Sequence, residues 1–336
     1  MRQLAGFRQG CDDLGDFSMP ARSARRRAYR AAIFGTKDSP EKNPRTAVVG
    51  RVLDVSPHVI VLQTETGESR FPLTPRTSAW RGGKIRPAAL REGDHAVIRT
   101  TRKVATSIWA QIGRVTGTII ETDGRELLVD TGPAKGRQIL MIDEGSQRRI
   151  QVRFPRLEPG YLIDVIGLRQ QGFLRAMLPA TAQPPYRADH PPAPPLISGH
   201  VPETLSGTAV WHEPGEEPDN LLGVAYPALD PETDCEQYPN DVEPHAVDPH
   251  DFGAGCVRLP YLSVSSLLRL RNECSDRTEI LPVTSCGAFA RLFCDRCVEC
   301  GTSPKGRIAD LTMAAFVELG GNLESGCFNA SMTVVT

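Results

Sequence analysis

The sequence predicts a mainly β protein, with two tandem small β-barrels followed by a third, cysteine-rich β domain. Three observations carry this prediction. Short apolar runs separated by turn residues begin near residue 46, and their order recurs roughly 67 residues later. Eight of the nine cysteines lie in the last third of the chain. With 336 residues, the chain is long enough for several domains with separate cores.

Residues 1–45 form the first segment of the chain. They are polar, rich in arginine and without apolar periodicity, and they end in a proline-containing charged stretch. This composition predicts a disordered N-terminal arm.

Residues 46–113 and 114–178 are expected to be two copies of one small β-barrel. Each copy contains short runs in which apolar and polar residues alternate, as in half-buried strands. The expected strands are 48–55, 59–67, 90–99 and 108–112 in the first copy, and 115–122, 127–132, 157–167 and 173–178 in the second.

Glycines recur at matching positions in the two copies. Both open with Val-x-Gly-x-Val/Ile, which places Gly50 and Gly117 where a strand curves or another backbone comes close. Both also carry a glycine turn, at Gly93 and Gly160, before a long strand. The pattern resembles the small oligonucleotide/oligosaccharide-binding-like barrels that occur as tandem repeats in bacterial envelope proteins.

Barrels of that type often bind single-stranded nucleic acid through stacked aromatic residues in a basic groove. Here the basic residues are scattered among acids, and the aromatic residues are no more than cores and ordinary surfaces need, so a scaffold role is favoured over nucleic-acid binding. The residues weighed are Phe71, Trp80, Trp109, Phe154 and Tyr161, with Arg99, Arg102, Lys103, Arg148, Arg149 and Arg153.

Residues 179–205 are predicted to be a proline-rich linker. They contain Pro-Pro-Tyr, His-Pro-Pro and Ala-Pro-Pro, which favour a stiff, extended backbone. We expect a spacer between the barrels and the C-terminal domain, residues 206–336.

The C-terminal domain has a characteristic order of segments. They are Gly-Thr-Ala-Val-Trp-His at 207–212, Gly-Cys-Val-Arg-Leu-Pro at 255–260, Cys-Gly-Ala-Phe at 286–289, Arg-Ile-Ala-Asp-Leu-Thr at 307–312, a helix at 313–319 and a closing strand at 330–335. This order resembles the double-psi β-barrel of rare lipoprotein A-like proteins. The resemblance implies a six-stranded double-psi β-barrel with a short helix.

Lytic members of that family cleave the glycan strands of peptidoglycan, which requires a proton donor and a second group opposite it. On the family pattern, the aspartate position falls on Ser285 and the histidine position on Cys256, and neither is a carboxylic acid. Asp310 is retained, but it precedes the helix and is predicted to be a structural cap. The acidic insertion offers weak catalytic candidates: Asp248, His250 and Asp251.

The clustered cysteines favour a disulfide framework. The candidates are Cys235, Cys256, Cys274, Cys286, Cys294, Cys297, Cys300 and Cys327. The Cys-x2-Cys-x2-Cys run at 294–300 also suits zinc or an iron–sulfur cluster, but the expected fourth ligand does not follow it, so no metal or other cofactor is favoured. Reduced buried thiols are a further alternative.

The function expected from these features is that of a non-catalytic, cell-envelope-associated binding or scaffold protein, which presents the C-terminal barrel to peptidoglycan glycan or an envelope protein. The alternatives are a lytic transglycosylase or related wall hydrolase, and a protease inhibitor or phage-tail-like component. A disulfide framework favours the cell envelope or an extracellular location, whereas the lack of a readable signal peptide leaves the cytoplasm open.

Charge and hydropathy add little to this expectation. The formal net charge of −1 gives no global attraction to nucleic acid or anionic membranes. No apolar stretch is long enough to predict a membrane-spanning helix.

Overall fold

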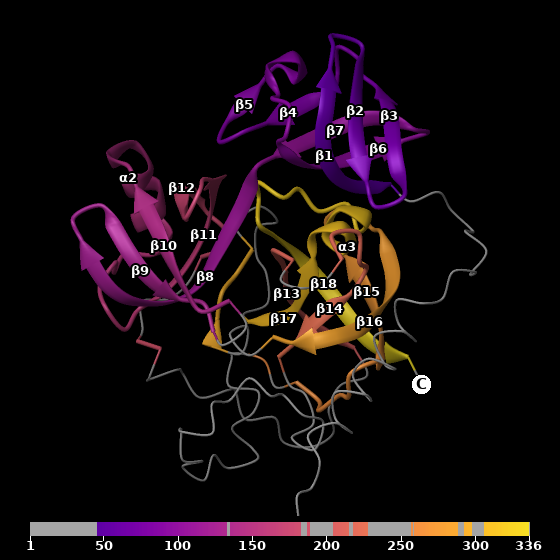
Figure 1. The fold of residues 1–336 in the computed structure, drawn as a ribbon. Helices are drawn as coiled ribbons and strands as arrows, with labels where there is room; N and C mark the ends of the chain where they lie inside the picture. The colour runs from indigo at the N-terminus through magenta and orange to yellow at the C-terminus, as the bar shows by residue number, and fades with distance from the viewer. Residues whose placement is uncertain are drawn as a thin grey trace, which may run out of the picture. The chain divides into compact units, whose positions relative to one another are not determined.

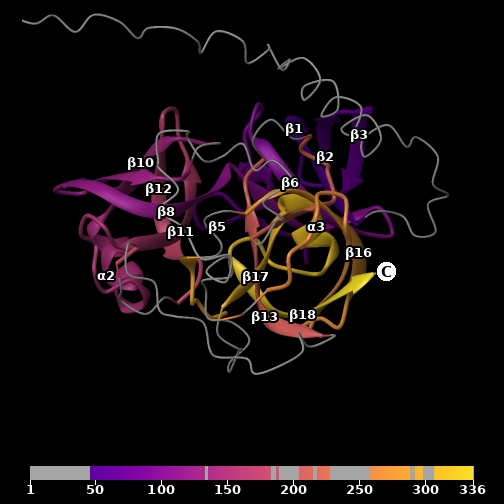
Figure 2. The same ribbon diagram turned by 90° about the horizontal axis from the view of Figure 1, so that it is seen from below.

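The computed structural model describes residues 46–132, 135–182, 187–188, 204–214, 218–227, 257, 259–287, 292–297 and 306–335. Figures 1 and 2 show their strands and helices from two directions. All of them belong to one compact unit, Pro44–Thr336. The expected N-terminal arm and most of the expected linker lie outside the described residues. The mainly β fold class is confirmed.

The first repeat forms a seven-stranded sheet of order β3-β2-β1-β6-β7-β4-β5. Its elements are β1 (Ala47–Val55), β2 (Val59–Thr64), β3 (Gly67–Pro72), β4 (Ser78–Trp80), β5 (Lys84–Ile85), the 3₁₀ helix η1 (Pro87–Ala89), β6 (His95–Thr101) and β7 (Val104–Ala110). The closed barrel expected here is not formed, because β3 and β5 are the two edges of this sheet and do not pair with each other.

The second repeat is a closed five-stranded barrel of order β10-β12-β11-β8-β9. Its elements are β8 (Ile112–Asp123), β9 (Glu126–Asp130), β10 (Arg137–Ile142), helix α2 (Glu144–Arg153), β11 (Leu162–Arg169) and β12 (Phe173–Pro179). The third and fifth strands, β10 and β12, are parallel, and α2 lies between the third and fourth strands in the chain. This is the small β-barrel expected for the second copy.

One glycine turn recurs in both copies with the same backbone hydrogen bond. Gly93 N donates to Val52 O at 2.8 Å, and Gly160 N donates to Ile119 O at 2.7 Å, in positions 67 residues apart. Both glycines have positive φ, 81° and 89°, as their turns require.

The Val-x-Gly pattern also has the same structural cause in both copies. A Cβ on Gly50 would lie 2.4 Å from Gln63 O, and one on Gly117 would lie 1.9 Å from Asp130 O. The first strand of each repeat therefore crosses the second too closely for any side chain, which confirms the close approach that the sequence predicts.

The C-terminal domain contains a closed six-stranded barrel of order β13-β17-β14-β16-β15-β18. Its elements are β13 (Leu205–His212), β14 (Val224–Tyr226), β15 (Leu267–Asn272), β16 (Thr278–Cys286), β17 (Arg307–Thr312), helix α3 (Met313–Glu318) and β18 (Cys327–Val335). The pairs β13/β17 and β14/β16 are parallel, and the other pairs are antiparallel. Trp211, Tyr226 and Phe316 are among its fully buried side chains.

In the described part of the chain, no helix has the length and apolar character that crossing a membrane requires.

Candidate binding face of the six-stranded barrel

An imidazole and a carboxylate meet on neighbouring strands of the six-stranded barrel. His212 ends β13 and Asp310 lies in β17, and their Nδ1 and Oδ1 atoms are 3.3 Å apart. The two side chains are 15% and 18% exposed, so both are largely enclosed but can still be reached from solvent.

The surroundings keep Asp310 ionised. Burial alone would raise the pKa of its carboxyl group, but the charge and hydrogen bond of His212, together with the positive charges of Arg307 and Arg114, lower this pKa from 3.8 to about 2. At neutral pH, Asp310 is therefore a hydrogen-bond acceptor and has no proton to donate.

The cap predicted at Asp310 is wrong. The N-cap residue of α3 is Thr312, whose Oγ1 accepts a hydrogen bond from Ala315 N at 3.4 Å. Asp310 is still within β17, two residues before that cap, and its carboxylate points to His212 instead. Thr312 Oγ1 also donates to Leu221 O at 2.5 Å, so it ties the segment before β14 to the start of α3.

Asp310 shares a row of the barrel with Ser285, the position at which the expected resemblance would place an aspartate. Strand pairing places Ala225 opposite Asp310 on one side and opposite Ser285 on the other. Residues paired in this way point to the same face of a sheet, and two strand spacings separate their Cα atoms by roughly 10 Å. The row therefore offers one carboxylate, a small methyl group and one hydroxyl. Cys256, Asp248, His250 and Asp251 lie outside the described residues.

A buried cluster of four charges lies next to this face, and we call it the ion cluster. It consists of Arg114, Asp164, Asp295 and Arg307, whose side chains are at most a few per cent exposed. Arg307 Nη2 is 2.6 Å from Asp164 and 2.5 Å from Asp295, and Arg114 Nη2 is 2.5 Å from Asp164. Burial would raise the pKa of Asp164, but Arg114 and Arg307 lower it.

The ion cluster was not predicted from the sequence. One signal of it exists in the sequence. Asp164 is the single acid in the apolar strand β11, in which all residues from Leu162 to Leu168 are buried. A charge in such a strand requires a partner.

The five described cysteines differ in their surroundings. Cys274 and Cys294 are disulfide-bonded, whereas Cys297 and Cys327 are buried against Val210. Cys286, at the end of β16, is partly buried. Cys235, Cys256 and Cys300 lie outside the described residues, so the complete framework stays a prediction.

The metal alternative is also untested. Within the described residues, no three His, Cys, Asp or Glu side chains gather as ligands. Cys300 lies outside those residues, so the Cys294–Cys297–Cys300 ligand set stays a prediction.

The aromatic residues of the two repeats are mostly core residues. Phe71, Trp80, Trp109 and Phe154 are buried, and Tyr161 is partly exposed. Four of the five aromatic side chains considered for base stacking are therefore buried.

The comparisons with known proteins do not assign a family. No protein-family model and no curated protein matches the chain. One solved structure that is similar in part is a multidomain protein with nucleic acid binding domains from Streptococcus pneumoniae TIGR4. It is 15% identical with a TM-score of 0.15, and the match covers 49% of this chain and 54% of that chain. Such a low TM-score carries no inference about fold or function.

Proposed function

We propose that this chain is a non-catalytic binding protein of the cell envelope, whose double-psi-type C-terminal barrel presents the face around Asp310 to peptidoglycan glycan. The observation that carries the proposal is the His212–Asp310 pair. It holds a carboxylate in its ionised form on a face whose next polar residue in the row is Ser285. Sugar hydroxyl groups can donate to the carboxylate and accept from the serine hydroxyl.

Glycosidic cleavage would need different groups. It requires a protonated acid and, in most such enzymes, a second carboxylate about 5–10 Å away. Asp310, with a pKa of about 2, is not a proton donor at neutral pH, and Ser285 supplies no second carboxylate. The chemistry of the described face therefore favours recognition of a glycan over its hydrolysis.

Co-sedimentation of the full chain with insoluble peptidoglycan tests glycan binding. We expect saturable binding that Ser285→Ala and Asp310→Asn each weaken about tenfold, since each removes a hydrogen bond to the sugar. Asp276→Asn is the matched control, because Asp276 lies in the β15–β16 turn of the same barrel with a largely exposed side chain. Unfolding curves of all three variants would separate a lost contact from a lost fold.

Zymography on the same peptidoglycan tests the enzymatic alternative. We expect no clearing by the purified chain. Clearing that disappears in Asp248→Asn or Asp251→Asn would show a wall hydrolase and overturn the proposal. If the chain captured an envelope protein and showed no affinity for glycan, the ligand of this face would be a protein and not peptidoglycan.

A further inference from the structure

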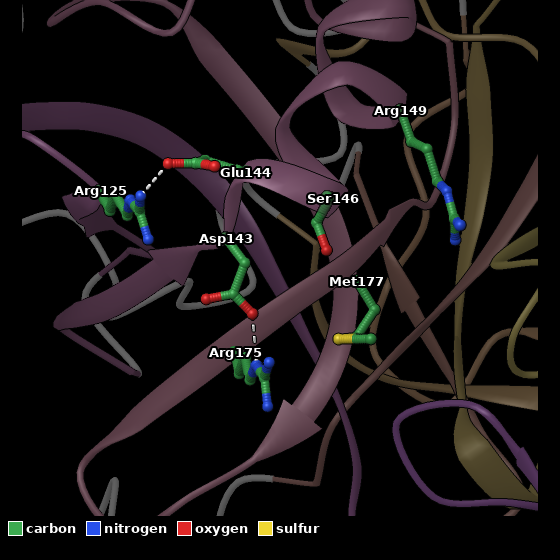
Figure 3. Close-up of a pocket in the computed structure, with 8 residues that line it drawn as sticks. Arg125, Asp143, Glu144, Ser146, Arg149, Arg175 and Met177 are labelled. Atoms are coloured by element: carbon green, nitrogen blue, oxygen red, sulfur yellow. Dashed lines mark hydrogen bonds and ion pairs between the residues drawn. The ribbon is translucent and has the colours of Figure 1, made fainter.

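A second candidate site lies in the five-stranded barrel. A cavity of about 460 Å³ lies between the start of α2, the beginning of β9 and strand β12. Figure 3 shows Ser146 and Arg149 of α2 and Met177 of β12 along this cavity, with Asp143 and Arg175 joined below the helix.

The start of α2 is open to a ligand. Asp143 is the N-cap residue, but its side chain makes no capping bond, because its carboxylate is 2.6 Å from Arg175. The amides of Ser146 and Gln147 donate to Asp143 O, which leaves those of Glu144 and Gly145 without a partner within the helix. Unpartnered amides at a helix start attract anions. Gly145, in that turn, has no atom within 4 Å of the place where a Cβ would be, so a ligand can approach the backbone closely.

Ser146 adds an independent observation. Its side chain is 94% buried (6% exposed) and lines the cavity. Its hydroxyl group forms no hydrogen bond with any residue that the structure describes. The hydroxyl group is therefore available to donate a hydrogen bond to a ligand in the cavity.

The charges of the cavity wall favour an anion. Arg125 pairs with Glu144, and Arg175 pairs with Asp143. Arg149 has no ion pair among the described residues, which leaves one positive charge in excess. The first-turn amides, the serine hydroxyl and this guanidinium group are all hydrogen-bond donors.

We infer that this cavity binds the phosphate group of a phosphorylated ligand. A phosphate carries several acceptor oxygens in a tetrahedral arrangement, so it can accept from the helix start, from Ser146 and from Arg149 at once. The cavity is larger than a phosphate alone, and Met177 supplies an apolar wall for the remainder of the ligand. This inference is independent of the proposed glycan binding.

Titration calorimetry of the full chain with inorganic phosphate, in a chloride buffer, tests the inference. We expect saturable binding that Arg149→Ala weakens about tenfold or more and Ser146→Ala weakens several-fold. Arg148→Ala is the matched control, because Arg148 is the exposed neighbour on the same helix and does not line the cavity. It should leave the affinity within about twofold, because a solvent-exposed charge that does not contact the phosphate is largely screened.

Two results would overturn the inference: no saturable phosphate binding, or equal loss in the Arg148 and Arg149 variants. A competition experiment then shows which kind of phosphorylated ligand displaces the bound phosphate. Displacement of phosphate by a single-stranded oligonucleotide indicates the phosphodiester of a polymer. Displacement by glycerol 3-phosphate, with no effect of the oligonucleotide, indicates a small phosphorylated molecule.

Discussion

Arg307 and Asp164 are 143 positions apart in the chain, yet their side chains form a 2.6 Å ion pair from which solvent is excluded. Arg307 begins β17 of the six-stranded barrel, and Asp164 lies in β11 of the five-stranded barrel. Arg114 and Asp295 complete the ion cluster on either side of them. The predicted linker at 179–205 therefore connects two barrels that share buried charges.

Replacing Asp164 with alanine should destabilise the whole compact unit. The substitution leaves Arg114 without its carboxylate partner and Arg307 with only Asp295, inside a region closed to water. Removing one partner of a buried ion pair costs about 3–5 kcal/mol. Urea unfolding of the full chain would measure this loss.

The matched control for that variant is Glu68→Ala. Glu68 pairs with Arg70 at 2.8 Å, but both side chains are exposed, so its loss should cost less than about 1 kcal/mol. Similar costs for the two variants would mean that the ion cluster does not hold the barrels together.

Sequence reasoning finds the repeats because their glycines are required by backbone contacts that recur at a fixed spacing. It misses β10 and α2 for a physical reason. In β10 the buried Leu140 and Ile142 alternate with Ile139 and Met141, which are also apolar, so the sequence shows no apolar/polar alternation. In α2 only Ser146 and Ile150 are buried, so the helix lacks a regular apolar face.

The candidate face could be predicted only in part. The expected resemblance leads to Ser285 and Asp310, but residue spacing alone does not show whether Asp310 or Thr312 is the N-cap residue of the helix. His212 becomes a partner of Asp310 only because β13 and β17 are parallel neighbours. Asp164 signals a buried charge, yet no local spacing leads from it to Arg307.

The His212–Asp310 pair should make stability depend on acid pH. The pKa of Asp310 is lowered from 3.8 to about 2 on folding, so its contribution is present above about pH 4 and is lost as the pH falls towards 2. A lowering of this size corresponds to about 2 kcal/mol. We expect Asp310→Asn to flatten the decline in unfolding free energy between pH 5 and pH 2. Asp276→Asn should keep the wild-type slope, and an unchanged slope in both variants would refute the coupling.

His212→Ala should raise the pKa of Asp310, because burial then acts with less opposition from nearby positive charge. Titration of the Asp310 carboxyl carbon by NMR would measure the change. His58→Ala is the control, since His58 is an exposed residue of the first repeat. A pKa that stays at about 2 without His212 would assign the lowering to Arg307 and Arg114.

Thr312→Val should loosen the start of α3. Valine keeps the shape of threonine but loses the oxygen that accepts from Ala315 N and Gly223 N and donates to Leu221 O. The loss should cost about 2–3 kcal/mol and speed hydrogen exchange at the Ala315 amide. Thr312→Ser retains the oxygen and should cost less than about 1 kcal/mol. Equal effects of the two substitutions would show that the hydroxyl group of Thr312 does not stabilise the start of α3.

Gly117→Ala should destabilise the five-stranded barrel although it adds a single methyl group. That methyl would lie 1.9 Å from Asp130 O, so β8 and β9 would have to separate at their crossing. Overpacking of this kind costs about 1–3 kcal/mol, and Gly50→Ala should behave alike because its methyl would lie 2.4 Å from Gln63 O. Gly83→Ala is the control, since nothing lies within 4 Å of its added carbon. If all three variants unfold at the same urea concentration as the unmodified chain, the repeated glycines do not mark a strand crossing.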